Sequence, residues 1–352
     1  MQIVSIGEVL WEVVGAEEYL GGAPLNFAAN AQRLGNLVTL VTAVGADARG
    51  AKALLQMRAL GLTTGMVQTV ADHPTGTAIV STDPQGNESF FIHRPAAFDG
   101  LKIDSAALSR FESIRPDWIY FGTLALTNAE TEEMLLQLVQ RLPQARIFYD
   151  MNLRAEHWDL PLVKRLSALA TVLKLNETEA ERLFTLTFGA RAFSVEEFCA
   201  FWSAAYNLKM ICVTLGSKGC AIYSQGKLRT FPGFCIKVKD TIGAGDAFAA
   251  AFLHGLNLNC TVEQIAVFAN GLGALVASRE GATPNWTVEE CLELIESGQR
   301  GSAQYFANAS GFTVHRSAHR AAPISTSEDI EKESGPAHRV PLPTQRLGLP
   351  RT

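Results

Sequence analysis

Residues 239–253 read KDTIGAGDAFAAAFL, and this stretch says more about the fold than any other part of the chain. Small residues lead into a run with helical character, in which Asp246 stands in the first turn. Gly243 and Gly245 allow tight backbone conformations that other residues avoid, and Ala244 adds almost no bulk. Free N–H groups can therefore surround an anion at the positive end of a helix.

A carboxylate at this helix start, that of Asp246, is expected to be held ionised, a state suited to taking a proton from a hydroxyl. A Rossmann fingerprint is excluded because Phe248 stands where its last glycine belongs. A Walker A loop is excluded because the Gly226-Lys227 pair lacks the Ser or Thr that must follow. The alternative is an ordinary glycine turn with an aspartate cap. The preceding run FCIKV, at 234–238, predicts a strand.

Outward from this turn, short apolar runs alternate with stretches of helical periodicity. Such alternation implies right-handed crossovers and a mostly parallel sheet, so the chain is predicted to have an α/β core. The predicted strands are 2–6, 37–44, 117–122, 145–149, 171–175 and 210–215. The predicted helices are 24–34, 51–60, 129–141, 159–169, 177–185 and 195–207.

One stretch departs from this rhythm. Two β-prone runs, Thr77–Thr82 and Glu88–Ile92, flank the turn sequence DPQGN at 83–87 and predict a hairpin. A hairpin within an α/β chain must project from the sheet or cover its face. It is either an ornamental excursion or a lid over a cleft at the carboxyl ends of the strands.

The composition narrows the class of protein. Of the 352 residues, 47% are hydrophobic and 18% charged, so the chain can bury a sizeable core. Acidic residues outnumber basic ones, 35 to 30, which argues against nucleic acid as a partner because binding phosphates requires basic surface. No apolar run approaches the roughly 20 residues of a membrane span, and the first residues, MQIVSIGE, do not resemble a secretory signal.

The cysteines and the last 40 residues add two expectations. The six cysteines form no C-x-x-C pair and sit among apolar neighbours, which predicts buried free thiols and a cytoplasmic protein. Residues 313–352 contain no aromatic residue and are rich in proline, which predicts a disordered tail. The histidines of this tail, His315, His319 and His338, match no zinc-binding spacing.

A second glycine-rich segment begins at Gly21 and Gly22, just before a helix that starts at Pro24. Two glycines permit a close approach of the backbone, and Asn26 adds hydrogen-bond donors and an acceptor at the same edge. This combination suits binding to sugar hydroxyls. The plain alternative is a loop-to-helix junction.

Taken together, these segments resemble the two signatures of the ribokinase-like, or phosphofructokinase-B-type, sugar kinases. The signatures are GGAPLNFAANAQRLG at 21–35 and DTIGAGDAFAAAFLHGL at 240–256. The similarity runs in order from about residue 3 to about residue 290 and is closest to the fructokinase branch. It includes VGADARG (44–50), FGTLALT (121–127), DMNLR (150–154), LKLNETEAERL (173–183), VTLGSKG (213–219) and SREGATP (278–284).

The resemblance implies a three-layer αβα sandwich, with a central mostly parallel sheet and a small β-sheet lid. The kinase domain would span 1–300, with lid segments around 8–22 and 66–98. The implied reaction transfers the γ-phosphoryl group of ATP to a sugar hydroxyl, with Mg²⁺ bound and K⁺ as an activating ion. Asp246 would be the base, and the backbone amides of Gly243, Ala244, Gly245 and Asp246 would form the anion hole.

Other roles carry over by position, and for each polar residue the alternative is a helix cap or a structural ion pair. The sugar-contacting positions are Gly21, Gly22, Asn26, Asn152 and Arg154. The ATP-contacting positions are Asn176, Glu179, Thr214, Gly216, Gly219 and Asn270. Glu179 would organise Mg²⁺ through water, and Asp240 would bind the monovalent cation together with carbonyls near 278–282.

The sequence departs from the family pattern after the first strand, where Glu12 stands in place of the usual sugar-binding aspartate. Arg94, after the hairpin, would reach an acidic substrate or a sugar hydroxyl. The Glu12 departure bears on which sugar is bound and not on the chemistry. The resemblance to the fructokinase branch makes fructose the leading substrate, with 2-keto-3-deoxygluconate or a nucleoside as alternatives. A sensor of sugar or nucleotide without turnover is the alternative from another class, although it would need no base. Exposed lids of this family also pair, which implies a homodimer.

Overall fold

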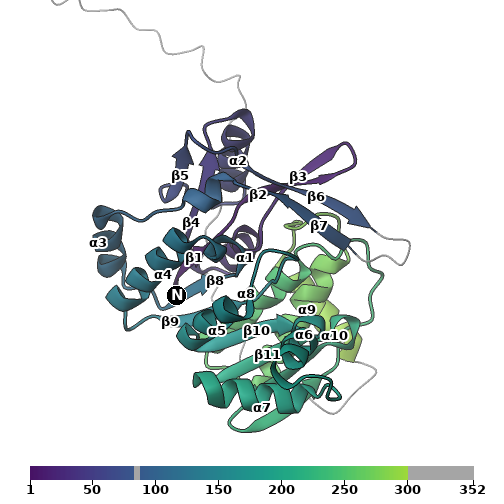
Figure 1. The fold of residues 1–352 in the computed structure, drawn as a ribbon. Coiled ribbons are helices and arrows are strands. Elements are labelled where there is room, and N and C mark those ends of the chain that lie inside the picture. The colour runs from purple at the N-terminus through teal and green to yellow at the C-terminus, as the bar shows by residue number, and fades with distance from the viewer. Residues whose placement is uncertain (83–87, 300–352) are drawn as a thin grey trace, which may run out of the picture. The chain divides into compact units, whose positions relative to one another are not determined.

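A computed structural model describes residues 1–82 and 88–299, all of which belong to one compact unit. In these residues the chain forms a nine-stranded sheet flanked by helices and a separate four-stranded sheet (Figure 1). The α/β sandwich with a small second sheet is therefore confirmed. The turn at 83–87 and the tail at 313–352 lie outside the described residues.

The large sheet has the order β13-β12-β11-β10-β9-β8-β1-β4-β5, and all its pairs are parallel except β11 with β12 and β12 with β13. From β1 the chain first moves outward to β4 and later returns to β8 on the other side. Ligands of such sheets bind where the strand order reverses, outside the carboxyl ends of the strands. The strands are β1 Gln2–Ile6, β4 Leu37–Gly45, β5 Val67–Val70, β8 Trp118–Phe121, β9 Arg146–Asp150, β10 Val172–Asn176, β11 Met210–Thr214, β12 Cys220–Ser224 and β13 Lys227–Phe231.

Helices cover both faces of this sheet because successive residues of each central strand point to opposite sides. In β8, Ile119 and Phe121 join the main core beneath α3 to α7. Tyr120, between them, points to the other face and stacks on Phe27 of α1, with ring centroids 3.6 Å apart. The helices are α1 Ala23–Arg33, α2 Ala48–Ala59, α3 Ser105–Ile114, α4 Ala129–Arg141, α5 Leu160–Leu169, α6 Glu177–Phe188, α7 Val195–Tyr206, α8 Ala244–Asn257, α9 Val262–Ala277 and α10 Val288–Gln299.

The small sheet has the order β3-β2-β6-β7 and projects beyond the large one (Figure 1). The predicted hairpin is confirmed, since β6 and β7 pair antiparallel. One face of this sheet packs through Leu10, Ala78 and Ile92 into a small core with Phe98. The range 66–98 that the sequence assigned to the lid also contains β5, which pairs with β4 in the large sheet. The strands are β2 Leu10–Val14, β3 Glu17–Gly21, β6 Gly76–Thr82 and β7 Glu88–His93.

The strand predicted at 234–238 is wrong, because this segment has no regular secondary structure. Pro232 follows directly after the edge strand β13 and lacks the N–H that a further ladder would need. The chain then crosses to the end of α9, where the Lys239 N–H donates to the carbonyl of Ala277 at 2.9 Å. Val238 is 55% exposed, so the apolar character of this segment does not reflect burial in a sheet, which the strand prediction had assumed.

All six cysteines are free thiols, as expected. Four of them are buried, Cys260 is half-buried, and Cys235 is exposed, contrary to the expectation that all would be buried. Cys235 lies in the irregular segment after β13. None of the helices within 1–82 and 88–299 has the length and apolar character of a membrane span.

Candidate active site

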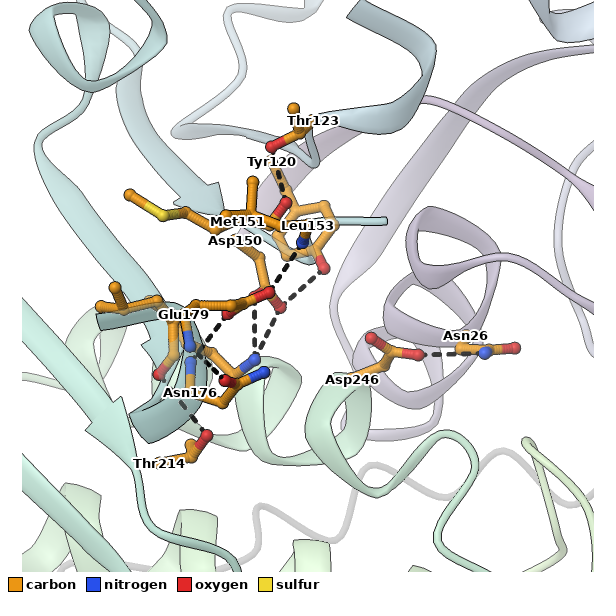
Figure 2. Close-up of polar contacts among 12 residues, drawn as sticks. Asn26, Tyr120, Thr123, Asp150, Met151, Leu153, Asn176, Glu179, Thr214 and Asp246 are labelled. Carbon is orange, nitrogen blue, oxygen red and sulfur yellow. Dashed lines mark hydrogen bonds and ion pairs between the residues drawn. The ribbon is translucent and has the colours of Figure 1, made fainter. Parts of the chain in front are cut away.

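The two glycine-rich signatures meet at the start of α8. The side chain of Asn26, on α1, donates through Nδ2 to Oδ2 of Asp246, on α8, at 3.0 Å (Figure 2). Both residues are buried, with exposed fractions of 2% and 8%. The structure thus brings together a candidate sugar-binding residue and the candidate base, which stand 220 positions apart in the chain.

The turn before α8 requires glycine at Gly243. Its φ is 77°, and a Cβ there would lie 2.1 Å from the carbonyl oxygen of Ala282. The carboxylate of Asp240 fixes the same turn, accepting from the N–H of Ile242 and of Gly281, each at 2.9 Å. The turn is therefore clamped against segment 278–284, which the sequence linked to the cation site.

The first amides of a helix have no acceptor within the helix, so they are available to an anion. Ala247 donates to the carbonyl of Gly243 at 2.9 Å and Ala244 to that of Thr241 at 3.3 Å. In the part of the chain that the structure describes, the N–H groups of Gly245 and Asp246 donate to no acceptor. These two donors suit an anion bound at the turn.

The protonation of Asp246 differs from the sequence expectation of a carboxylate held ionised. Burial raises its pKa to about 7, and the negative charge of Asp150 acts in the same direction. The hydrogen bond from Asn26 and the charges of Lys174 and Arg154 lower the pKa but do not cancel the effect of burial. Desolvation depends on packing and could not be read from the local sequence. A pKa near 7 still suits a general base at neutral pH.

Glu8 is a candidate that the sequence reasoning missed. It stands two residues after the last residue of β1, at the carboxyl edge of the sheet, and is 4% exposed. The pKa of its carboxyl is raised to about 7, chiefly by burial, and the negative charge of Asp246 acts in the same direction. Its position next to the end of the central strand, at the point where the strand order reverses, is the signal that could have indicated it.

A buried cluster behind the turn was also missed. Lys174 Nζ donates to the two carboxylate oxygens of Asp150 at 2.8 and 3.0 Å, and the Tyr120 hydroxyl donates to Asp150 at 3.1 Å. Figure 2 shows Asp150 and Tyr120 joined in this way. All three side chains are almost fully buried. The available signal was a lysine in the middle of the apolar run 171–175.

The pair Gly21 and Gly22 makes room for the two acidic residues that follow β1. A Cβ at Gly21 would lie 2.5 Å from Oε1 of Glu12, and a Cβ at Gly22 would lie 2.5 Å from the carbonyl oxygen of Glu8. Glu12 is 6% exposed and belongs to β2 of the small sheet. The segment therefore permits the close backbone approach that the sequence predicted.

Asn176 and Glu179 form the predicted capping box of α6. The Glu179 N–H donates to Asn176 Oδ1 at 2.8 Å, and the Asn176 N–H donates back to Glu179 Oε2 at 2.8 Å. Glu179 Oε1 also accepts from the N–H of Leu153, at 2.7 Å, which ties α6 to the loop after β9 (Figure 2). Each carboxylate oxygen has more than one acceptor site, so Glu179 can still hold a metal-bound water.

Two of the candidate ATP contacts, Gly219 and Asn270, lie at the end of β13. A Cβ at Gly219 would lie 2.1 Å from the carbonyl oxygen of Phe231, and Asn270 of α9 donates to that of Pro232 at 3.1 Å. Gly216 has a φ of 60° and stands in the turn after β11. Thr214, at the end of β11, donates to the carbonyl of Leu175 at 3.5 Å.

Arg94 is held apart from these groups. It forms an ion pair with Asp99 and donates to Oγ1 of Thr127 at 2.5 Å. It lines a cavity of about 760 Å³ that Asp246 and Asn26 do not line. The sequence-predicted contact of Arg94 with the substrate thus has no support from this geometry.

The D-x-N-x-R element begins with the buried Asp150, the last residue of β9, and continues into the loop that follows. Asn152 has a φ of 45° and a buried Nδ2 that makes no hydrogen bond within the described residues. The positive charge of Arg154 lowers the pKa of both Glu8 and Asp246. Within 1–82 and 88–299, no group of three or more His, Cys, Asp or Glu side chains could hold a metal ion.

Comparison with known proteins identifies the class. The model of the pfkB family of carbohydrate kinases matches residues 3–288. The chain belongs to this family and is a sugar kinase. It is 30% identical to a fructokinase-1 from Oryza sativa subsp. japonica over 292 residues, which cover 79% of this chain and 88% of the relative. It is also 30% identical to a fructokinase from Escherichia coli over 295 residues, covering 79% and 91% of the two chains.

Solved structures share the fold. A fructokinase with bound ATP from Xylella fastidiosa superposes with a TM-score of 0.73 at 23% identity, covering 84% of this chain and 98% of its own. A protein from Escherichia coli assigned as ribokinase II, in complex with ATP and Mg²⁺, gives a TM-score of 0.73 at 21% identity and covers 84% and 99%.

Proposed function

We propose that this sugar kinase transfers the γ-phosphoryl group of ATP to a hydroxyl of fructose, with Asp246 as the general base. The observation that carries the proposal is the contact between Asn26 and Asp246 beside two available helix amides. A base, a sugar-binding side chain from α1 and an anion site then meet at the first turn of α8. A sensor without turnover would need no such base.

The proposed step begins with the sugar hydroxyl next to the Asp246 carboxylate, which accepts the proton as the hydroxyl oxygen attacks the γ-phosphorus of ATP. The bond from this phosphorus to the β–γ bridging oxygen breaks, and ADP leaves with that oxygen. Asn26 orients the carboxylate through its hydrogen bond to Oδ2. The amides of Gly245 and Asp246 stabilise the charge that spreads over the phosphoryl oxygens in a loose transition state. These donors belong to a clamped turn, so they need no reorganisation during the step.

The residues present fit ATP, which two structural neighbours contain, and Mg²⁺, which one of these two contains. Gly216, Gly219, Thr214 and Asn270 would border the nucleotide, and Asn176 with Glu179 would hold water around the metal. Bound Mg²⁺ would neutralise part of the phosphate charge. A monovalent cation would bind beside Asp240 and carbonyls near 278–282, and its removal should lower the rate without preventing sugar binding.

The assignment of fructose rests on the fructokinase relatives, and the sugar-binding group on this chain would be Glu12. Gly21 leaves room for the longer carboxylate, so Glu12 can replace aspartate in binding hydroxyls. A 2-keto-3-deoxygluconate kinase needs a cation for the substrate carboxylate. The ion pair of Arg94 with Asp99 argues against this alternative.

The test is a coupled assay of ADP release by the purified protein with fructose, tagatose, ribose, 2-keto-3-deoxygluconate or adenosine. The proposal expects the highest kcat/KM with fructose. A preference for another sugar would overturn the fructose assignment alone. No stimulation of ADP release by any of these compounds would overturn the proposed activity.

Two further proposals concern the setting of the enzyme. The small sheet would act as a lid that excludes water during transfer, and its outer face would pair with a second copy. Exposed apolar residues on that face, Ile79 and Phe91, support the pairing. Six free thiols, one of them exposed at Cys235, support a reducing compartment such as the cytoplasm.

A further inference from the structure

The catalytic turn has a buried cation directly behind it. If Gly245 carried a Cβ, the nearest atom outside the local chain would be Nζ of Lys174, at 3.7 Å. The side chain of Lys174 rises from β10 and is 3% exposed. Because Gly245 has no side chain, the ammonium group of Lys174 directly faces the backbone of the turn that presents the anion-binding amides.

Asp150 fixes this ammonium in place. Both oxygens of its carboxylate accept from Lys174 Nζ, and one also accepts from the hydroxyl of Tyr120. Tyr120 is in turn stacked between the strands and Phe27 of α1. An ammonium group has three N–H donors. The hydrogen bonds to the two oxygens of Asp150 hold the Lys174 ammonium group in place and leave one of these donors for another acceptor.

Stability alone does not explain this ion pair. Taking two charges out of water costs more than their attraction commonly returns, and apolar residues of similar size are often equally stable. The pair lies beneath the residues proposed to transfer the phosphoryl group. A functional reason for keeping both charges is therefore available in the same place.

We infer that Lys174 is a positioning residue for phosphoryl transfer, whose clamped ammonium group favours the ionised form of the Asp246 carboxylate and adds positive potential beneath the anion-binding turn. This inference rests on the proposed function. The pKa of Asp246 supports it, since the charge of Lys174 lowers that pKa whereas the charge of Asp150 raises it. Asp150 therefore orients Lys174, while its own negative charge opposes part of the lowering of the Asp246 pKa by Lys174.

The other charges that face Asp246 come from few elements. Arg154, in the loop after β9, lowers its pKa, and Glu8, after β1, interacts with it as a second negative charge. The two helices packed against α8, which are α1 and α9, place no charged side chain against Asp246. In α1, Arg33 donates to the carbonyl of Pro284, and in α9, Glu263 pairs with Arg229.

The test measures the pKa of Asp246 directly, by NMR titration of ¹³C-labelled aspartate carboxyls, with Asp246→Asn used to assign the signal. Lys174→Met should raise this pKa by about one unit, which is a tenfold change in proton affinity. Asp150→Asn should lower it. Lys174→Met leaves the buried Asp150 carboxylate without its ion-pair partner. A second comparison avoids this problem: the double variant Asp150→Asn/Lys174→Met is measured against Asp150→Asn, so that both proteins lack the carboxylate and differ only at Lys174.

Activity supplies the second measurement. In both comparisons, loss of Lys174 should move the acidic limb of the kcat profile to higher pH and lower the plateau, with the KM for ATP changed much less. Lys102→Met, which removes an exposed lysine paired with Glu130, is the matched control and should change neither. An unchanged Asp246 pKa, or an equal loss of kcat at every pH, would overturn the inference. A wild-type protein without kinase activity would instead overturn the proposed function, and the titration would remain readable.

Discussion

At the scale of single residues, Asp246 combines burial with a chemical task. A carboxyl group this well covered is costly to ionise, which is why its pKa rises to about 7. Glu8, nearby, has its pKa raised to about 7 for the same reason. The folded protein therefore binds protons at these positions at a pH where the unfolded chain has already released them.

This difference predicts how stability depends on pH. The folded-state pKa of Asp246 lies above its ordinary value of 3.8, so ionisation destabilises the fold progressively as pH rises from about 4 to about 7. Asp246→Asn removes this cost and should raise the free energy of unfolding at pH 8 by up to about 4 kcal/mol. The gain should shrink towards pH 5.

Urea unfolding of the wild type and Asp246→Asn at pH 8 and pH 5 measures this effect. Glu8→Gln should show a gain of the same sign, for the same reason. A gain of equal size at both pH values would contradict the explanation by ionisation.

A second prediction concerns Gly21. The backbone of Gly21 does not lie in the left-handed region, so its conformation is open to alanine. The alanine Cβ would lie only 2.5 Å from Oε1 of Glu12 and would therefore displace the Glu12 carboxylate. If Glu12 binds sugar hydroxyls, Gly21→Ala should raise the KM for sugar about tenfold or more and leave the KM for ATP near the wild-type value. Steady-state kinetics with each substrate varied in turn measures the two constants.

The control for this substitution is Gly65→Ala, whose Cβ would meet its nearest neighbour at 3.9 Å. It should change neither KM. An equal rise in both constants for Gly21→Ala would show a general disturbance of the site and contradict a role of Glu12 in sugar binding.

At the scale of elements, the small sheet has two different faces. One face carries Leu10, Ala78 and Ile92 into a buried core. On the other face Ile79 and Phe91 stand opposite each other on β6 and β7 and are 42% and 64% exposed. Neighbouring apolar residues left in water at the edge of a sheet favour association with a second apolar surface.

The proposed pairing of two copies predicts that Phe91→Glu converts a dimer into a monomer, because it places a charge on the exposed apolar face of the edge strand β7. Sedimentation velocity of wild type and variant at the same concentration measures the change. Leu136→Glu, at an exposed leucine of α4, is the control and should leave the mass unchanged. A monomeric wild type would contradict the proposal.

At the scale of the whole molecule, the sequence was a good guide where periodicity and capping agreed. Helix α4 has the bounds predicted, since Asn128 caps its start and a proline follows shortly after its end. Strands β12 and β13 were not predicted, because five-residue antiparallel strands at an edge have too little pattern to stand out. FCIKV had the composition of a strand but no neighbour with which to pair.

The candidate site was predictable in part for the same reason. Local spacing indicated the capping box of Asn176 and Glu179, and the structure has it. The contact between Asn26 and Asp246 joins positions 220 residues apart, so only the resemblance to a family could suggest it. The cluster of Lys174, Asp150 and Tyr120 had one local signal, the lysine within the apolar run 171–175, but its partners and the raised pKa of Asp246 arise from packing around the turn.

The central claim is that Asp246 acts as the base at the turn of α8. Its most direct test is the steady-state kcat of Asp246→Asn with ATP and the best sugar substrate, alongside calorimetric binding of both ligands. The account predicts a kcat lower by about 10²–10⁴-fold, with both dissociation constants close to those of the wild type. A kcat within a few-fold of the wild type would contradict it.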